Sequence, residues 1–383
     1  MINEAKSGFS GVLDYLPIIL ILGIILGYGG YLTLFGALII TFIFLFSKIK
    51  YPIILGATIT NIVTVAFINV TLGGKIETLV SLLFLSSLIT ILLSNTNIHK
   101  RTILSVPKAV SSGFITGCIT SAIILIFPTL FNLKAYGATF LINFNSLLYQ
   151  PINEQALCCS LVVLTIYYYL SKLKSKWLPK GFISVVTGSF INFIYHMDLT
   201  TIDIGIKNLN KVATGNFANI AHLLLFSFLI ALVMIVQSLS TMKALKIKGF
   251  EKRILFLQGV SNFISSFLGA YSGSVAYIPT KENKINKLKT KIPTIIEFLV
   301  LLLFVIFFKE ISSLIPVCCC SMLLIIKGYE ILKQNIQAIS YKNIQNKTIF
   351  YGCFLTSIYN INLAIVLSII ITLIINTKES RQK

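Results

Sequence analysis

The sequence predicts an all-α polytopic membrane protein, and its composition, its apolar runs and the placement of its basic residues all indicate this fold class. Of the 383 residues, 56% are hydrophobic and 11% are charged, whereas a soluble domain carries roughly 25% charged residues. The apolar runs are long and do not alternate with polar residues, which favours membrane-spanning helices over a β-barrel.

Fourteen apolar segments can be distinguished along the chain, some of them short. An even number of spans returns the chain to the side from which it started, so both termini are expected on the same side. The segments cover about residues 11–28, 30–47, 51–70, 76–95, 105–131, 156–171, 178–196, 217–240, 254–270, 272–280, 292–308, 311–328, 346–359 and 361–377.

The formal net charge of +20 is explained by membrane topology. Most of the 32 lysines and arginines fall in the two termini and in every second loop. Basic residues concentrate on the cytoplasmic side of membrane proteins, so we predict two cytoplasmic termini and no nucleic-acid partner. The basic residues on the opposite side are Lys75, Lys134, Lys207, Lys211 and Lys309.

The first two spans form a helical pair joined by a tight turn at residues 28–30, and the third span is interrupted near its start. There Pro52 and Gly56 break the helical pattern. Gly56 is followed by Ala57 and Thr58, so the span opens with a glycine and a hydroxyl side chain. We interpret this segment as a half-helix that begins inside the membrane.

The fifth span carries small residues at intervals of three and four positions, among them Ser111, Gly113, Thr116 and Gly117. Such spacing is typical of closely packed membrane helices. Close packing is therefore the favoured interpretation, and direct contact with a substrate is the alternative.

A second interrupted span lies between Gln258 and Thr280, where an apolar helix breaks at residues 269–273 and resumes at Ser274. Irregular backbone at membrane depth is tolerated only where it is buried in protein or lines a polar cavity. A half-helix that starts there directs free N–H groups and the positive end of its dipole into that cavity. We therefore predict that this stretch forms half of an anion-binding site.

The two breaks occupy matching places in the chain. Gly56 falls in the third of the first seven segments, and Gly273 falls in the third of the second seven. Because seven is odd, the two halves run through the membrane in opposite senses. Paired broken helices in an inverted repeat indicate a transporter binding site.

No pattern in the sequence indicates an enzyme, a metal or another cofactor. The seven cysteines all lie in apolar runs, and no histidine or acid stands at ligand spacing from Cys318, Cys319 and Cys320. A nucleophile–base pair and a phosphate-binding loop are also missing from the sequence. We expect these cysteines to be small buried hydrophobic residues.

Four stretches, in this order, resemble the SulP family of anion transporters, which are sulfate permease-like proteins related to the solute carrier 26 group. The resemblance covers about residues 10–377. The stretches are VPKAVSSGFITG (106–117), LPKGFISVVTGS (178–189), QGVSNFISSFLGAYSGS (258–274) and LIPVCCCSMLLI (314–325).

This resemblance implies a seven-plus-seven inverted repeat that holds the substrate between the third and tenth half-helices. Residues 1–100 and 215–310 would form a core domain that moves against a gate domain of residues 101–214 and 311–383. The family also implies a homodimer formed through the gate. Its members usually end in a cytoplasmic STAS domain, which is expected to be absent because this chain stops at Lys383.

The sequence departs from the family where the substrate would bind. An arginine expected in the tenth span is absent, and the eighth-span acid is replaced by Gln237. Because an arginine and an acid in one cavity stabilise each other, losing both leaves a neutral site. We predict a site suited to a monovalent anion or a neutral polar solute, and less suited to sulfate. The predicted substrate-binding residues are Gly56, Ala57, Thr58, Gln237, Gly273, Ser274, Val275, Ala276 and Tyr277.

The resemblance implies a secondary transporter of inorganic anions, and two other functions stay open beside it. One is a channel-like or transport-silent scaffold that kept the fold while its site changed. The other is a nucleobase-type carrier, although the acids that such carriers place in the eighth and tenth spans are absent here.

Predictions of the coupling ion depend on four residues of the spans. H+ coupling needs an intramembrane carboxylate, for which Glu297 and Asp14 are the candidates, with Glu297 expected to reach the membrane interface. Na+ coupling through oxygens near Thr58 and Gln237 is the alternative. We expect an integral protein of the bacterial inner membrane, surrounded by lipid.

Overall fold

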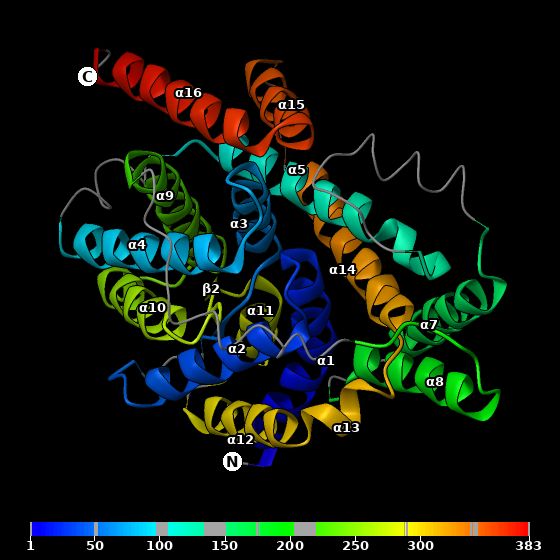
Figure 1. Ribbon diagram of the computed structural model, residues 1–383. Coiled ribbons are helices and arrows are strands. Elements are labelled where there is room, and N and C mark those ends of the chain that lie inside the picture. Colours follow the sequence, from blue (N-terminus) through cyan, green and yellow to red (C-terminus); the bar gives the residue numbers. More distant parts are fainter. Residues whose placement is uncertain are drawn as a thin grey trace.

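The computed structural model describes residues 2–49, 53–96, 106–133, 151–173, 175, 177–202, 220–286, 288, 290–337, 339 and 344–381, which are almost entirely helical (Figure 1). A pair of two-residue strands interrupts the helices. The helices are α1 (Ile2–Leu26), α2 (Gly30–Leu45), α3 (Ile59–Thr71), α4 (Ile76–Asn95), α5 (Lys108–Ile126), the 3-10 helix η2 (Phe127–Phe131), α7 (Glu154–Lys172), α8 (Lys180–Ile194), α9 (Ile220–Ala244), α10 (Glu251–Ser266), α11 (Tyr277–Ile285), α12 (Ile292–Ile306), α13 (Phe308–Ser312), α14 (Val317–Gln337), α15 (Ile344–Tyr359) and α16 (Ile361–Arg381).

The predicted class, an all-α polytopic membrane protein, is confirmed. Within the described residues, five helical stretches are long and apolar enough to cross a membrane, and several shorter apolar helices accompany them. The number of fourteen spans and the seven-plus-seven repeat stay predictions. The five long stretches are Asn3–Leu26, Ile76–Asn95, Lys108–Phe131, Glu154–Lys172 and Ile220–Ala244.

The helices pack in two groups that meet along α1 and α3 (Figure 1). In one group α4 packs against α9 and α10, and α12 packs against α1 and α2. In the other group α5 packs against α14, α15 and α16, and α7 packs against α8 and α14. Helix α1 also contacts α8 and α14, and α3 also contacts α5. Whether these groups move as the core and gate domains, with the boundaries given above, stays a prediction.

Some of the small residues of α5 allow another helix to pack closely, and others line the cavity described below. A Cβ atom at Gly113 would lie 2.5 Å from the Phe350 carbonyl oxygen, and one at Gly117 would lie 2.3 Å from Cβ of Ser357. Both glycines therefore allow α15 to approach α5 closely, which confirms the packing interpretation for these two positions. Ser111 instead lines the cavity.

Three predicted element boundaries are wrong. The first half-helix does not open at Gly56, because Leu55–Gly56 forms strand β1 and α3 begins only at Ile59. The second half-helix does not resume at Ser274, because Ser274–Val275 forms strand β2 and α11 begins only at Tyr277. The twelfth span does not begin at residue 311, because α13 ends at Ser312 and α14 starts at Val317, directly after Pro316. Proline disfavours the α conformation in the residue before it, which favours a new helix starting after Pro316.

Candidate functional site

The two interrupted spans meet in a two-stranded antiparallel sheet. Strand β1 (Leu55–Gly56) pairs with β2 (Ser274–Val275), with Leu55 opposite Val275 and Gly56 opposite Ser274. Gly273 adopts a φ of +102°, and a Cβ atom there would lie 1.9 Å from the Gly56 carbonyl oxygen. Only glycine accepts both the left-handed backbone and the close approach.

Helix α10 holds the second break through two side chains that are one helical turn apart. The Asn262 amide donates to the Gly273 carbonyl oxygen at 2.8 Å and accepts from the Gly273 N–H at 3.0 Å. The Gln258 side chain accepts a hydrogen bond of 2.5 Å from Ser238, whose hydroxyl in turn accepts from the Val275 N–H at 3.2 Å. All five residues in these contacts are buried, so these bonds satisfy polar groups that lipid could not.

Side chains from α1 and α3 hold the two breaks against each other. Asn61 donates to the Ser274 hydroxyl at 2.7 Å, and the Thr58 and Ser274 hydroxyls lie 3.2 Å apart. The Tyr15 hydroxyl donates to the carbonyl oxygen of Ala57. The start of α3 is therefore tied to both β2 and α1.

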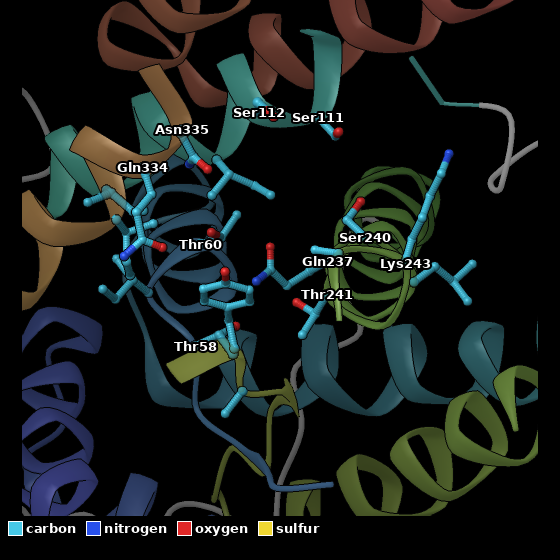
Figure 2. Close-up of a pocket in the computed structure, with 18 of the residues that line it drawn as sticks. Thr58, Thr60, Ser111, Ser112, Gln237, Ser240, Thr241, Lys243, Gln334 and Asn335 are labelled. Carbon is cyan, nitrogen blue, oxygen red and sulfur yellow. The ribbon is translucent and has the colours of Figure 1, made fainter. Parts of the chain in front are cut away.

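A cavity of about 540 Å³ lies in front of this strand pair and is bounded by residues of α1, α3, α5, α9, α11 and α14. Figure 2 shows side chains that approach it from α3, α5, α9 and α14. None of the described residues that line it is Asp or Glu. The polar lining residues are Tyr15, Thr58, Thr60, Lys108, Ser111, Ser112, Gln237, Ser240, Thr241, Lys243, Tyr277, Gln334 and Asn335.

The nine predicted site residues come together, but only some of them line the cavity. Ala57, Thr58, Gln237, Ala276 and Tyr277 do so. The other four lie behind the cavity wall, in the buried strand pair and its glycine turn. They hold the backbone from which the lining residues next to the breaks extend. These four are Gly56, Gly273, Ser274 and Val275.

Several lining residues were not identified from the sequence. Thr241 follows Gln237 by four positions on α9, so helical spacing alone could have indicated it. Tyr15, Gln334 and Asn335 come from α1 and α14. These two helices are far from both breaks in the sequence, and no local pattern links them to the site.

The cavity is arranged to hold negative charge. The first N–H groups of a helix have no partner within the helix, and α3 and α11 both begin at the cavity wall. Each helix start carries the equivalent of about half a positive charge. Lys108 and Lys243 add formal charge where the cavity reaches solvent, because both side chains are exposed.

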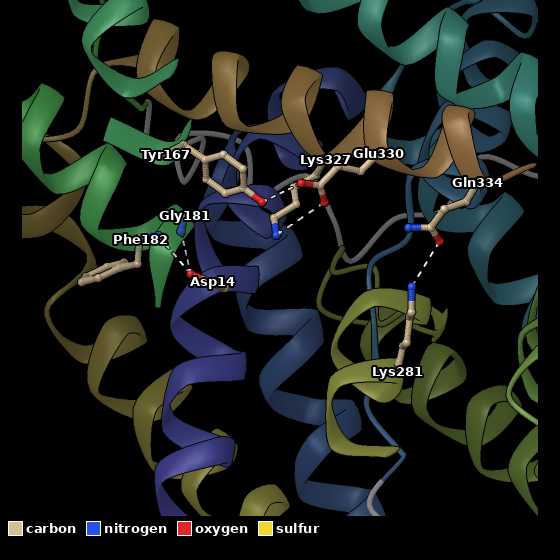
Figure 3. Close-up of polar contacts among 8 residues, drawn as sticks. All are labelled: Asp14, Tyr167, Gly181, Phe182, Lys281, Lys327, Glu330 and Gln334. Carbon is tan, nitrogen blue, oxygen red and sulfur yellow. Dashed lines mark hydrogen bonds and ion pairs between the residues drawn. The ribbon is translucent and has the colours of Figure 1, made fainter. Parts of the chain in front are cut away.

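The intramembrane carboxylates lie outside the cavity. Glu297 of α12 is 2% exposed and hydrogen-bonds with Thr41 of α2. The expectation that Glu297 reaches the membrane interface is therefore wrong, because its side chain faces the interior rather than the lipid. Asp14 of α1 accepts hydrogen bonds from the N–H groups of Gly181 at 2.8 Å and Phe182 at 3.2 Å, at the start of α8 (Figure 3).

Comparison with known proteins agrees with this architecture. Residues 8–356 match the Sulfate permease family. No curated protein matches the chain. The transmembrane domain of a cyanobacterium bicarbonate transporter, BicA, is similar in structure, with a TM-score of 0.77, 16% identity and coverage of 96% of this chain and 97% of that one.

A mammalian structure is similar as well. Murine Solute Carrier 26 family member A9, an anion transporter in the inward-facing state, gives a TM-score of 0.80 and 15% identity. The similarity covers 99% of this chain and 69% of the murine chain. At these identities the likeness indicates a shared fold.

Proposed function

The chain belongs to the sulfate permease family, and from that premise we propose that it is a secondary transporter of small inorganic anions. The observation that carries the proposal is the cavity between the starts of α3 and α11. Its polar lining consists of hydroxyl groups, amides and lysines, with apolar side chains between them and no carboxylate among the described residues. The charged groups in this lining therefore favour an anion over a cation.

We propose a monovalent anion, such as chloride, nitrate or bicarbonate, as the substrate. The two helix starts supply together about one positive charge. An anion bound there exchanges water for N–H groups and the Thr58 and Tyr277 hydroxyls. Sulfate carries two charges, so it would lose more hydration for the same compensation.

The proposed mechanism is alternating access by movement of the core domain against the gate domain. The cavity extends to Lys108 at the start of α5 and to Lys243 near the end of α9, where both side chains are exposed. The neighbouring loops are rich in lysine, so the positive-inside rule puts this side in the cytoplasm. The conformation described would then be the inward-open one, with the same cavity facing the opposite side after the movement.

The homodimer and the coupling ion also belong to the proposal. Glu297 would serve H+ coupling, because it is a carboxyl group buried inside the protein on a predicted membrane span. Oxygens near Thr58 and Gln237 would serve Na+ coupling instead. Uptake driven by a pH gradient or by a Na+ gradient, measured separately, distinguishes the two ions.

Counterflow tests the proposed function directly. Proteoliposomes loaded with unlabelled chloride, nitrate, bicarbonate or sulfate should accumulate the matching labelled anion transiently, and the monovalent anions should give the larger signal. Uptake of labelled anion that is no faster with unlabelled anion inside the proteoliposomes would indicate a channel. No uptake, together with no anion-dependent thermal stabilisation, would indicate a transport-silent scaffold and would reject the proposal.

A further inference from the structure

A lysine that the predicted site did not include lies on the second half-helix, beside the cavity. Lys281 follows Tyr277 by four positions on α11, so both side chains lie on one face of the helix. Its ammonium nitrogen lies 5.6 Å from the centre of the Tyr277 ring and donates to Oε1 of Gln334 at 3.2 Å. Figure 3 shows the Lys281–Gln334 contact between α11 and α14.

Both partners of Lys281 belong to the cavity lining. Tyr277 lines the cavity from α11, and Gln334 lines it from α14. Lys281 itself is not one of the lining residues, but its ammonium group contacts two side chains that are.

The charge of Lys281 is not neutralised by an acid among the side chains that the structure describes. The ion pair in that part of the molecule joins Lys327 to Glu330 at 3.9 Å. Among the described side chains, Lys281 contacts a neutral amide and an aromatic ring. Gln334 offers this ammonium group a neutral carbonyl oxygen, whereas an anion would add the attraction between opposite formal charges, so an anion competes with Gln334 for this lysine.

We propose that Lys281 is the anion-recognising cation of this transporter and that Gln334 holds it while the cavity is empty. The inference rests on the proposed transport of anions, and it adds the formal charge that the two helix starts lack. The ligand class is a small inorganic anion. Lysine's flexible stem lets the ammonium group move from Gln334 to the anion without a change in the backbone.

The transfer of the Lys281 ammonium group from Gln334 to the anion would link anion binding to movement of the core domain against the gate domain. Lys281 lies in the predicted core part of the chain, and Gln334 lies in the predicted gate part. An anion that draws Lys281 away from Gln334 removes one polar contact between these parts. Binding would thereby lower the barrier to the movement that carries the anion.

The test measures thermal stability of the purified full chain against increasing chloride, nitrate and bicarbonate, each with the same counter-ion. Loss of one charge-assisted hydrogen bond should weaken the apparent affinity of Lys281→Gln by about tenfold or more. Lys281→Arg should retain most of the affinity. Lys252→Gln is the matched control, because it removes the same charge at the exposed start of α10 and should leave the affinity unchanged.

Gln334→Ala tests the second half of the proposal. If Gln334 only holds the lysine, its removal leaves the apparent affinity equal to or higher than that of the unaltered chain. A weaker affinity would make Gln334 an anion ligand and would overturn its holding role. Lys281→Met, which keeps an apolar stem against Tyr277, is a second charge-free variant if Lys281→Gln does not fold.

The outcomes separate this inference from the proposed function. If the unaltered chain shows no anion-dependent stabilisation, the proposed function fails and this inference fails with it. If the unaltered chain responds and Lys281→Gln responds equally, only the role of Lys281 is overturned. An equal loss in Lys252→Gln would also overturn it, because the effect would then come from net charge.

Discussion

The side chain of Asn262 pairs with the backbone of Gly273 through two hydrogen bonds, one to its carbonyl oxygen and one from its N–H. A carboxamide presents one donor and one acceptor side by side, as a neighbouring β-strand does. Asn262 thus completes the pairing of the chain beside β2, whose other side pairs with β1. The geometry of the cavity wall depends on this contact.

Replacing Asn262 with Ala should therefore destabilise the protein strongly. Both Gly273 groups would be buried without a partner, at about 1–3 kcal/mol each. We expect a large fall in the apparent Tm and loss of anion-dependent stabilisation, measured by thermal unfolding. Asn95→Ala at the end of α4 is the control, since that amide makes only a 3.4 Å contact to the Ile91 carbonyl oxygen and should change the Tm little.

Gly273→Ala should abolish folding or transport, whereas Gly249→Ala should be tolerated. Both glycines have positive φ, +102° and +87°, so both variants carry backbone strain of about 1–2 kcal/mol. Only at Gly273 would the new Cβ lie 1.9 Å from the Gly56 carbonyl oxygen, while nothing lies within 4 Å at Gly249. Yield of folded protein and counterflow rate compare the two, and equal effects would contradict the close-approach argument.

Gln237→Glu should weaken anion binding in a pH-dependent manner. The Gln237 side chain lines the cavity, and a carboxylate there would repel the anion. Protonation neutralises that carboxylate, so the affinity should fall as pH rises and recover as pH falls. Gln237→Leu carries no charge at any pH and is the control. A pH-independent affinity in the glutamate variant would place the anion away from Gln237.

Asp14→Ala should destabilise the start of α8 by about 1–2 kcal/mol, as loss of an N-terminal cap does. One Asp14 oxygen accepts from both Gly181 and Phe182, so the carboxylate joins α1 to α8. Asp198→Ala removes an exposed carboxylate and should have a small effect on the Tm. If Asp14→Ala instead leaves the Tm unchanged and removes the effect of a pH gradient on uptake, Asp14 serves coupling.

Glu297→Gln should retain counterflow and lose acceleration by an inward pH gradient. The amide is nearly the same size as the carboxyl group and fits the same interior position, but it cannot release or take up a proton. Glu310→Gln alters an exposed carboxylate of α13 and should keep the full response. Uptake that still responds to the pH gradient in Glu297→Gln would remove H+ coupling through this residue.

Much of the fold class could be predicted from local sequence. Apolar runs too long for strands require helices, because only hydrogen bonds within the segment satisfy the backbone in lipid. Gly56 and Gly273 indicated the two breaks for a related reason, since they interrupt runs that would otherwise remain helical. The start of α11 was misplaced by three residues, because nothing local distinguishes a short buried strand from the first turn of a half-helix.

The site could be predicted only where its residues are close in sequence to a break. Thr58 and Tyr277 follow the breaks directly, and Gln237 was found through the family pattern. Tyr15 reaches the cavity because α1 packs against α3 and α11, and Gln334 reaches it because α14 packs against α1 and α5. Packing of helices that are distant in the sequence leaves no local signal. The burial of Glu297 was missed for the same reason. Its short separation from Lys291 in the sequence does not reveal which side chains of other helices cover it.

Local sequence alone indicates that the chain enters the membrane as helices, that two spans are interrupted at glycines, and that basic residues gather in alternate loops. These properties depend on the transfer of each segment into lipid and on backbone geometry, which are local. The pairing of the two breaks as strands and the contact between Lys281 and Gln334 are visible only in the folded molecule. Such contacts join residues tens to hundreds of positions apart, and they form only when the helices have packed.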